Sequence, residues 1–213
     1  MKIISINTAE VQQLAIGDKS IASGIYKTPR KGAVAIGEFG LDGDNIVDTQ
    51  VHGGKDQAVY LYSAEDYAWW SAQLGRDIPP GTFGENLTIS GFHDGALRIG
   101  DQLLINDSVH LEITAPRVPC VKFAHKMSDP KFVKKFVAAE RPGCYARVLK
   151  PGVVNVGDTL QWQTTAQDYA TIKEVFVEWH KKAWSKEVAK KALASPISNI
   201  ARGIIERRAG VAW

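Results

Sequence analysis

The chain has 213 residues, enough for one sizeable hydrophobic core or for a main domain with an appendage. Hydrophobic residues make up 45% and charged residues 23% of the chain, which excludes a disordered protein, and no apolar run is long enough to cross a bilayer. The formal net charge is +3, and the positive excess lies beyond residue 165, where nine Lys/Arg stand against five Asp/Glu. Charged helix faces explain such an excess better than nucleic-acid binding does.

Short strand patterns fill the chain from its start to about residue 165. The first seven residues read as a strand and lack the apolar block of a signal peptide, so we expect a cytoplasmic protein. In residues 109–114, apolar Val109, Leu111 and Ile113 alternate with polar neighbours, which is typical of a half-buried strand. Further strands are predicted at residues 33–36, 58–62, 103–105 and 160–162. Strands this short and numerous predict a barrel or a folded-over sheet.

Three helices interrupt these strands. One begins at a Ser63 cap and continues to Leu74, and a second covers residues 120–125. The third is predicted over residues 129–139, with Asp129 as its cap and Pro130 in its first turn. The tryptophans at 69, 70, 162 and 179 are expected to pack in the core or between helices.

Helical spacing takes over in the tail. Thr171 and Glu174 form a capping-box pattern, and apolar sets follow at helical spacing around residues 172–179, 188–193 and 197–205. We therefore predict two domains, a β domain at 1–165 and a three-helix domain at 166–213. The second is too small to be very stable alone, so we expect it to pack on the first domain or on a second subunit in a homodimer.

Cys120 is the first candidate for chemistry. It follows Arg117 in the hexapeptide Ala-Pro-Arg-Val-Pro-Cys, and a thiol near a guanidinium favours the thiolate that attacks electrophiles or binds soft metals. A buried structural cysteine is an equally good explanation of this hexapeptide alone. The other thiol, Cys144, is interpreted as structural. The two cysteines lack the CxxC spacing of a zinc site.

Three loops are further candidates. Paired glycines beside a lysine let backbone N–H groups approach an anion, as in His52-Gly53-Gly54-Lys55, although a tight turn explains the same residues. Glu85 and Asn86 are candidates for contact with a polar heterocycle, or for another turn. Arg30 and Lys31 lie in a basic loop that suits a phosphate, or that is simply solvated.

These motifs, in this order, resemble the MOSC domain, which is shared with molybdenum cofactor sulfurases and amidoxime-reducing components. The tail is similar to the three-helix domain of the bacterial N-hydroxylaminopurine resistance branch. The segments that carry the resemblance are Gly40-Leu41-Asp42-Gly43-Asp44, His52-Gly53-Gly54 with Tyr60 and Tyr62, Phe83-Gly84-Glu85-Asn86-Leu87, Pro116-Arg117-Val118-Pro119-Cys120, Trp179-His180 and Ile205-Glu206-Arg207-Arg208.

The resemblance implies a mainly β fold with helices (α+β), namely a MOSC-type β-barrel with a C-terminal three-helix appendage. It implies a molybdenum cofactor (molybdopterin) whose metal takes the Cys120 thiolate, with Arg117 keeping that thiolate ionised. The reaction implied is reduction of small N-hydroxylated bases or amines, with electrons from a separate flavoprotein reductase. The implied cofactor-binding residues are Arg30, Lys31, His52, Gly53, Gly54, Lys55, Glu85, Asn86 and Arg117.

Three other functions stay open. Cys120 as a persulfide would make the protein a sulfur carrier for metal–sulfur cluster assembly, without a metal of its own. A barrel that only recognises a phosphorylated ligand would need no reactive thiol. A cysteine hydrolase would need Cys120 paired with His52 or His125, a geometry that no motif in the chain demands.

Overall fold

An eight-stranded sheet forms the centre of the computed structural model, which describes residues 1–45, 47 and 53–210. Its strand order is β13-β9-β10-β11-β7-β8-β1-β4, and only β7 and β8 run parallel. A three-stranded sheet, β12-β5-β6, and a β2-β3 hairpin complete the strands. The strands are β1 (Lys2–Thr8), β2 (Gln12–Ile16), β3 (Lys19–Ser23), β4 (Thr28–Pro29), β5 (Val34–Gly37), β6 (Gly40–Leu41), β7 (Val59–Ser63), β8 (Leu87–Ser90), β9 (Gln102–Ile105), β10 (Val109–Pro116), β11 (Cys144–Lys150), β12 (Gly152–Val154) and β13 (Leu160–Gln163).

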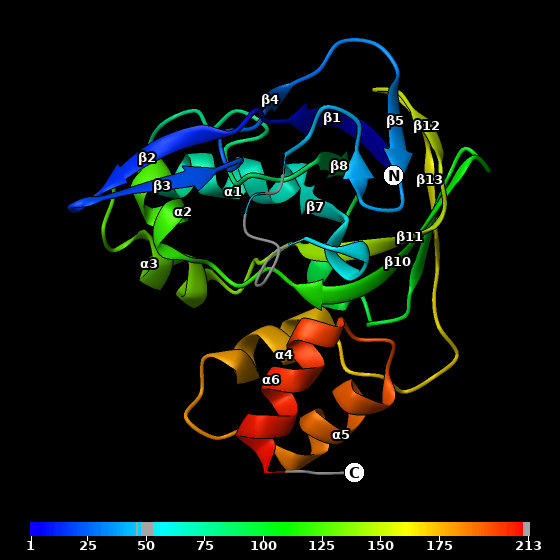
Figure 1. The fold of residues 1–213 in the computed structure, drawn as a ribbon. Coiled ribbons are helices and arrows are strands. Elements are labelled where there is room, and N and C mark those ends of the chain that lie inside the picture. Colours follow the sequence, from blue (N-terminus) through cyan, green and yellow to red (C-terminus); the bar gives the residue numbers. More distant parts are fainter. Residues whose placement is uncertain (46, 48–52, 211–213) are drawn as a thin grey trace.

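Helices lie at two places around this sheet. Figure 1 shows the last three grouped together at one end of the molecule, where α4 contacts β10. None of the helices in the described ranges has the length and apolar character that crossing a membrane requires. The helices are α1 (Ala64–Leu74), α2 (Val121–Lys126), α3 (Phe132–Ala139), α4 (Ile172–Trp179), α5 (Lys186–Ala194) and α6 (Asn199–Ala209), with short 3-10 helices η1 (Lys55–Gln57) and η2 (Asp94–Ala96).

The predicted alternation in β10 is confirmed as far as Ile113, whereas Thr114, predicted on the polar side, is fully buried. Val109, Leu111 and Ile113 are fully buried, while His110 and Glu112 between them are half-buried. β10 pairs with β9 on one side and β11 on the other, so its apolar face lies in the centre of the core. The end of this strand leads directly into Arg117 and Cys120 and thereby sets their position.

The mainly β class with helices is confirmed, but the described strand pairings do not form a closed barrel. The sheet bends round until Lys2 and Thr159 form a single bridge between β1 and the start of β13. Two backbone hydrogen bonds flank it, from Ile3 N to Asp158 O (3.0 Å) and from Leu160 N to Met1 O (3.1 Å). The predicted MOSC-type β-barrel is thus not closed by a continuous ladder. Among the described residues, the two ends of the sheet are joined only by the Lys2–Thr159 bridge and its neighbouring hydrogen bonds.

Two predicted helix starts are confirmed. The Ser63 hydroxyl accepts hydrogen bonds from the backbone N–H groups of Glu65 and Asp66 and caps α1. Thr171 and Glu174 form the complete capping box at the start of α4. Both caps satisfy N–H groups that have no partner within the helix.

The predicted start of the third helix is wrong. α3 begins at Phe132, three residues after the expected cap. The Asp129 carboxylate instead accepts a hydrogen bond from the backbone N–H of Lys131 (2.8 Å) and closes a local turn before the helix. Aspartate side chains commonly stabilise such turns in competition with helix caps.

Two apolar clusters make up the core. The larger one runs without interruption from the strands into α4, α5 and α6, for example through Val175, Leu193 and Ile205. The smaller one is aromatic and joins α1, α2 and α3, with Phe83, Phe123 and Phe136 near its centre. The division into domains at 1–165 and 166–213 stays a prediction.

The tryptophans divide between core and surface. Trp70 is buried, and Trp69 and Trp179 are half-buried against the aromatic and the larger cluster. The core prediction is wrong for Trp162, which is 37% exposed. It lies on the edge strand β13, and its indole N–H donates to Asp101 Oδ2 (2.9 Å).

Candidate functional site

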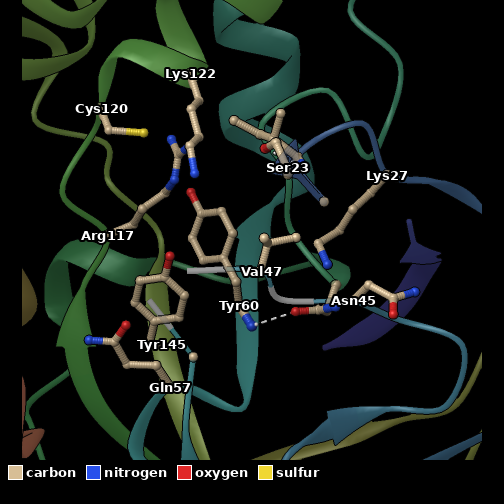
Figure 2. Close-up of a pocket in the computed structure, with 15 residues that line it drawn as sticks. Ser23, Lys27, Asn45, Val47, Gln57, Tyr60, Arg117, Cys120, Lys122 and Tyr145 are labelled. Carbon is tan, nitrogen blue, oxygen red and sulfur yellow. Dashed lines mark hydrogen bonds between the residues drawn. The ribbon is translucent and has the colours of Figure 1, made fainter. Parts of the chain in front are cut away.

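A cavity of about 100 Å³ opens beside the end of β10. Cys120, Arg117 and Lys122 line it from the segment after β10, and Tyr60 and Tyr145 line it from β7 and β11 (Figure 2). Because β11 pairs with both β10 and β7, these side chains from three separate parts of the sequence meet at one place.

Cys120 is half-buried and faces this cavity. It precedes α2, and its backbone carbonyl accepts hydrogen bonds from the N–H groups of Phe123 (3.0 Å) and Ala124 (3.4 Å). Cys144 is fully buried at the start of β11, as the sequence predicts. Of the two thiols, Cys120 lines this cavity and Cys144 does not.

Arg117 is a buried cation in the wall of the cavity, only 5% exposed. Its guanidinium lies over the rings of Phe123 and Tyr60, 4.1 and 5.4 Å from their centroids, which stabilises a desolvated charge. Burial opposes this charge, but nearby phenol and thiol groups outweigh the effect and raise the Arg117 pKa; they belong to Tyr60, Tyr145 and Cys120. Its Nη1 has no hydrogen-bond partner among the described residues, so the wall offers a charged donor to a ligand.

Tyr145 completes the wall beside this arginine. Burial raises the Tyr145 pKa, although a hydrogen bond from Arg117 acts in the opposite direction. The phenol therefore keeps its proton on Oη near neutral pH and stays neutral.

A second cation, Lys27, is neutralised within the wall. Its ammonium is paired with the Asp44 carboxylate, and both side chains are almost fully buried. Burial lowers the Lys27 pKa, while Asp44 acts in the opposite direction. Asp44 also accepts a hydrogen bond from Asn86 Nδ2 (2.8 Å), and Asn86 Oδ1 accepts one from the backbone N–H of Tyr60 (3.0 Å, Figure 2).

A fourth cation near this cavity, Lys126, lies behind the wall. Its ammonium donates to the backbone carbonyls of Ile25 and Gly81, each at 2.7 Å. Burial lowers the Lys126 pKa to about 7, with further lowering by Arg117 and Lys27 that Glu85 opposes.

The structure brings together some of the predicted site residues. Cys120, Arg117, Gly53 and Asn86 line the cavity. Gly54, the N-cap residue of η1, does not line it, and His52 lies outside the described residues.

Four other predicted residues do not line this cavity. Arg30 and Lys31 are exposed on the loop after β4. Lys55 is exposed and forms an ion pair with Glu38 (2.6 Å). Glu85 is fully buried, and its carboxylate accepts hydrogen bonds from within the protein.

Several residues of the wall follow no local sequence motif. Lys122, Tyr145 and Gln57 were not predicted as site residues, whereas Lys27 belongs to the same predicted basic loop as Arg30 and Lys31. The positions of these wall residues depend on strand pairing between distant segments, which no local motif records. The basic residue Lys122, two positions after Cys120, was a signal that local reading offered.

A second cavity, of about 250 Å³, lies on another side of Cys120. It shares Gln57, Cys120 and Tyr145 with the first cavity, and Trp179 and Ile204 line it from the C-terminal helices. Apart from the shared residues, the lining side chains are small or apolar.

Known proteins resemble this chain in sequence. The uncharacterized protein YflK of Bacillus subtilis is 37% identical over 159 residues, which cover 75% of this chain and 72% of that protein. A protein of Gibberella moniliformis named Reductase is 32% identical over 161 residues, which cover 74% of this chain but only 28% of that protein.

Solved structures share the fold. The structure of YiiM from Geobacillus stearothermophilus matches with a TM-score of 0.81 and 26% identity over 98% of both chains. YiiM from Escherichia coli matches with a TM-score of 0.73 at 20% identity, over 98% of this chain and 92% of that chain, which shows the shared fold alone.

The MOSC domain family matches residues 48–161, more than half of the chain. The match contains Gly53, Asn86, Arg117 and Cys120, the predicted residues that line the first cavity. The chain therefore belongs to the MOSC domain family.

Proposed function

We propose that the protein is an oxidoreductase that holds a molybdenum cofactor in the first cavity and reduces N-hydroxylated bases or amines. MOSC domains are associated in general with binding of this cofactor. The observation that carries the proposal is the placement of the Cys120 thiol in a cavity wall beside a buried arginine whose Nη1 has no partner among the described residues.

The residues present fit such a cofactor in their chemistry. No group of three or more His, Cys, Asp or Glu in the described residues is arranged to hold a metal ion, so a metal here would take Cys120 and bring its other ligands with the cofactor. A thiolate is a soft ligand suited to such a centre. Arg117 and Lys122 supply positive charge for the phosphate of the pterin, and Gly53 supplies a backbone without a side chain.

Each residue of the wall then has a separate task. Arg117 favours the thiolate form of Cys120 and binds the anionic part of the cofactor. Tyr145 holds a proton on Oη near the reacting groups. The Lys27–Asp44 pair and Asn86 fix the opposite wall without adding net charge. The proposed cofactor-binding residues do not include four predicted residues that lie outside the cavity, namely Arg30, Lys31, Lys55 and Glu85. A role for His52 beside Gly53 stays a prediction.

When bound, the cofactor supplies the two-electron chemistry of the reaction. The N–O bond of a substrate R–NHOH breaks, two electrons and two protons enter, and the products are R–NH₂ and water. The electrons would come from a separate flavoprotein reductase, in keeping with the absence of GxGxxG and CxxCH motifs from the sequence. The basic tail is a candidate docking surface for that partner or for a second subunit.

The test is the molybdenum content of protein made in a host that synthesises the cofactor. We expect wild type and Cys144→Ala to carry molybdenum and Cys120→Ala to lose at least about tenfold, because loss of a direct ligand should cost no less than loss of an outer-shell partner. Cys144→Ala is the matched control, since it removes the other thiol, which is fully buried.

Equal molybdenum in all three proteins would remove Cys120 from the site. No molybdenum in any of them, together with an added sulfur on Cys120 by mass spectrometry, would favour the sulfur carrier instead. Reduction of an N-hydroxylated base by the loaded protein with a chemical electron donor tests the reaction itself.

A further inference from the structure

The second cavity is built differently from the first. The charged side chains that line the cavities lie on one side of Cys120 only. They line the first cavity and belong to Arg117, Lys122 and Lys27. The second cavity takes Trp179, Ile200 and Ile204 from α4 and α6, and its remaining unshared residues are alanines, prolines and a valine. An anion has no charged partner there, whereas an apolar ring does find apolar contacts.

Gln57 is the polar group of this cavity that is short of a partner. It is only 7% exposed, and its Oε1 accepts no hydrogen bond from the described residues. A buried amide oxygen without a donor is unfavourable, so a ligand that offers an N–H or O–H group gains from binding here. Gln57 shares the wall between the two cavities with Cys120 and Tyr145.

We propose that the second cavity is the substrate compartment, an inference that rests on the proposed function. It would take the ring of a planar, uncharged, aromatic N-hydroxylated compound, whose N–H or O–H group donates to Gln57 Oε1 next to Cys120. The volume of about 250 Å³ lies just below the usual ~300–1,000 Å³ of pockets for drug-sized ligands, which suits a ligand of one or two fused rings.

This assignment gives the C-terminal helices a role in specificity. Trp179 belongs to α4, and Ile200 and Ile204 belong to α6. The cofactor would approach Cys120 from the charged side and the substrate from the apolar side, so the two would meet at Cys120 in the wall that both cavities share.

Isoleucine methyl NMR of the cofactor-free protein tests the compartment with benzamidoxime as the probe. We expect saturable shifts of the Ile200 and Ile204 methyl groups. Ile36 and Ile89, buried in the sheets, should not move, and neither should Ile25, which lines the first cavity. Shifts at Ile25 without shifts at Ile200 and Ile204 would overturn the inference.

Three variants sharpen this test. Gln57→Leu should weaken benzamidoxime binding about tenfold, as expected for a lost hydrogen bond to a buried acceptor. Ile204→Trp should fill the cavity and abolish the shifts, while Glu206→Trp adds the same ring at an exposed position of the same helix and should change nothing. The unliganded spectra of Ile36 and Ile89 report whether each variant is folded. Unchanged binding in folded Ile204→Trp would refute the proposal.

Molybdenum content separates this inference from the proposed function. If Ile204→Trp keeps molybdenum but loses benzamidoxime, both stand. If wild type binds molybdenum but benzamidoxime acts only at Ile25, the cofactor site stands and the compartment is refuted. If no protein binds molybdenum while the Ile200 and Ile204 methyl groups still shift, the redox function fails and the apolar compartment stands as a small-molecule site.

Discussion

Four donors converge on the buried carboxylate of Glu85. They are the hydroxyl groups of Tyr67 (2.8 Å) and Thr88 (2.6 Å), the backbone N–H of Gly81 (2.6 Å) and the side-chain amide of Asn7 (3.4 Å). Burial nevertheless raises the Glu85 pKa, against the effect of these hydrogen bonds. The carboxylate thus organises the turn before β8 and does not reach the cavity.

Neighbouring Glu85 and Asn86 illustrate the limit of local sequence reading. Both were predicted to contact a ligand, but only Asn86 lines the cavity. Successive side chains of an extended segment point to opposite faces, so one of the pair faces the cavity and the other faces the interior. A motif identifies the segment that builds the site, and only the fold decides which of its residues face the ligand.

The same distinction explains what was predicted at the site and what was not. Cys120 and Arg117 lie within one hexapeptide, so their proximity was visible from sequence. Tyr145, Gln57 and Lys27 reach the cavity from three distant segments. Their convergence depends on pairing across β10, β11 and β7, which no spacing rule encodes.

Lys126 should make stability depend on pH. Because its pKa is lowered from 10.5 to about 7 in the folded protein, the unfolded chain binds more protons between those values. The free energy of unfolding therefore rises with pH from about 7 to about 10, and this contribution is lost below pH 7. Lys126→Met should flatten that rise, by up to about 1.4 kcal/mol per pH unit.

Urea unfolding at pH 7 and 9.5 measures this dependence. Lys134→Met, an exposed lysine of α3, is the control and should keep the wild-type slope. A Lys126→Met slope identical to wild type would show that Lys126 is not the group responsible.

At the scale of elements, the capping box of α4 is the clearest local determinant. Thr171 Oγ1 accepts from Glu174 N (3.1 Å), and Glu174 Oε2 accepts from Thr171 N (2.8 Å). Thr171→Ala should lower the free energy of unfolding by about 1 kcal/mol, because it leaves an N–H group of the first turn without its acceptor.

Ser185→Ala is the matched control for this cap. Ser185 occupies the same position before α5, but its hydroxyl makes no capping hydrogen bond. Urea unfolding of both variants should show a loss for Thr171→Ala and almost none for Ser185→Ala. Equal losses would mean that the capping hydrogen bond is not the cause.

Elements with a periodic pattern or a marked apolar run were predicted from sequence, and these include the short strands β5, β9 and β13. Two helices and one strand were predicted because their apolar residues recur at a fixed spacing. A capping residue, Ser63 or Thr171, also marks the start of each helix, and Val109 begins the strand. The hairpin of β2 and β3 was not predicted, because most of its residues are exposed and leave little apolar alternation. Local turn chemistry at Asp129 likewise displaced the expected start of α3.

At the scale of the whole molecule, the sheet and the C-terminal helices share one apolar cluster. Arg147 reinforces this junction, because it pairs with Glu112 of β10 (3.1 Å) and Asp56 of η1 (3.0 Å) and donates to the carbonyl of Pro196 before α6 (2.8 Å). A core without a break between two regions favours their unfolding together.

Calorimetry tests this cooperativity. We expect one thermal transition whose calorimetric and van't Hoff enthalpies agree. Thr171→Ala, although located in the tail, should then lower the midpoint of that single transition by about 2–4 °C. Two separate transitions, with only one sensitive to Thr171→Ala, would support independent domains at 1–165 and 166–213.

The partition formed by Gln57, Cys120 and Tyr145 has a thermodynamic consequence. Because one set of side chains faces both chambers, any occupant that shifts them on one side alters the affinity on the other. Such coupling is reciprocal: whatever factor the first occupant imposes on the second, the second imposes on the first. The strength of this coupling would then be set by the three shared residues.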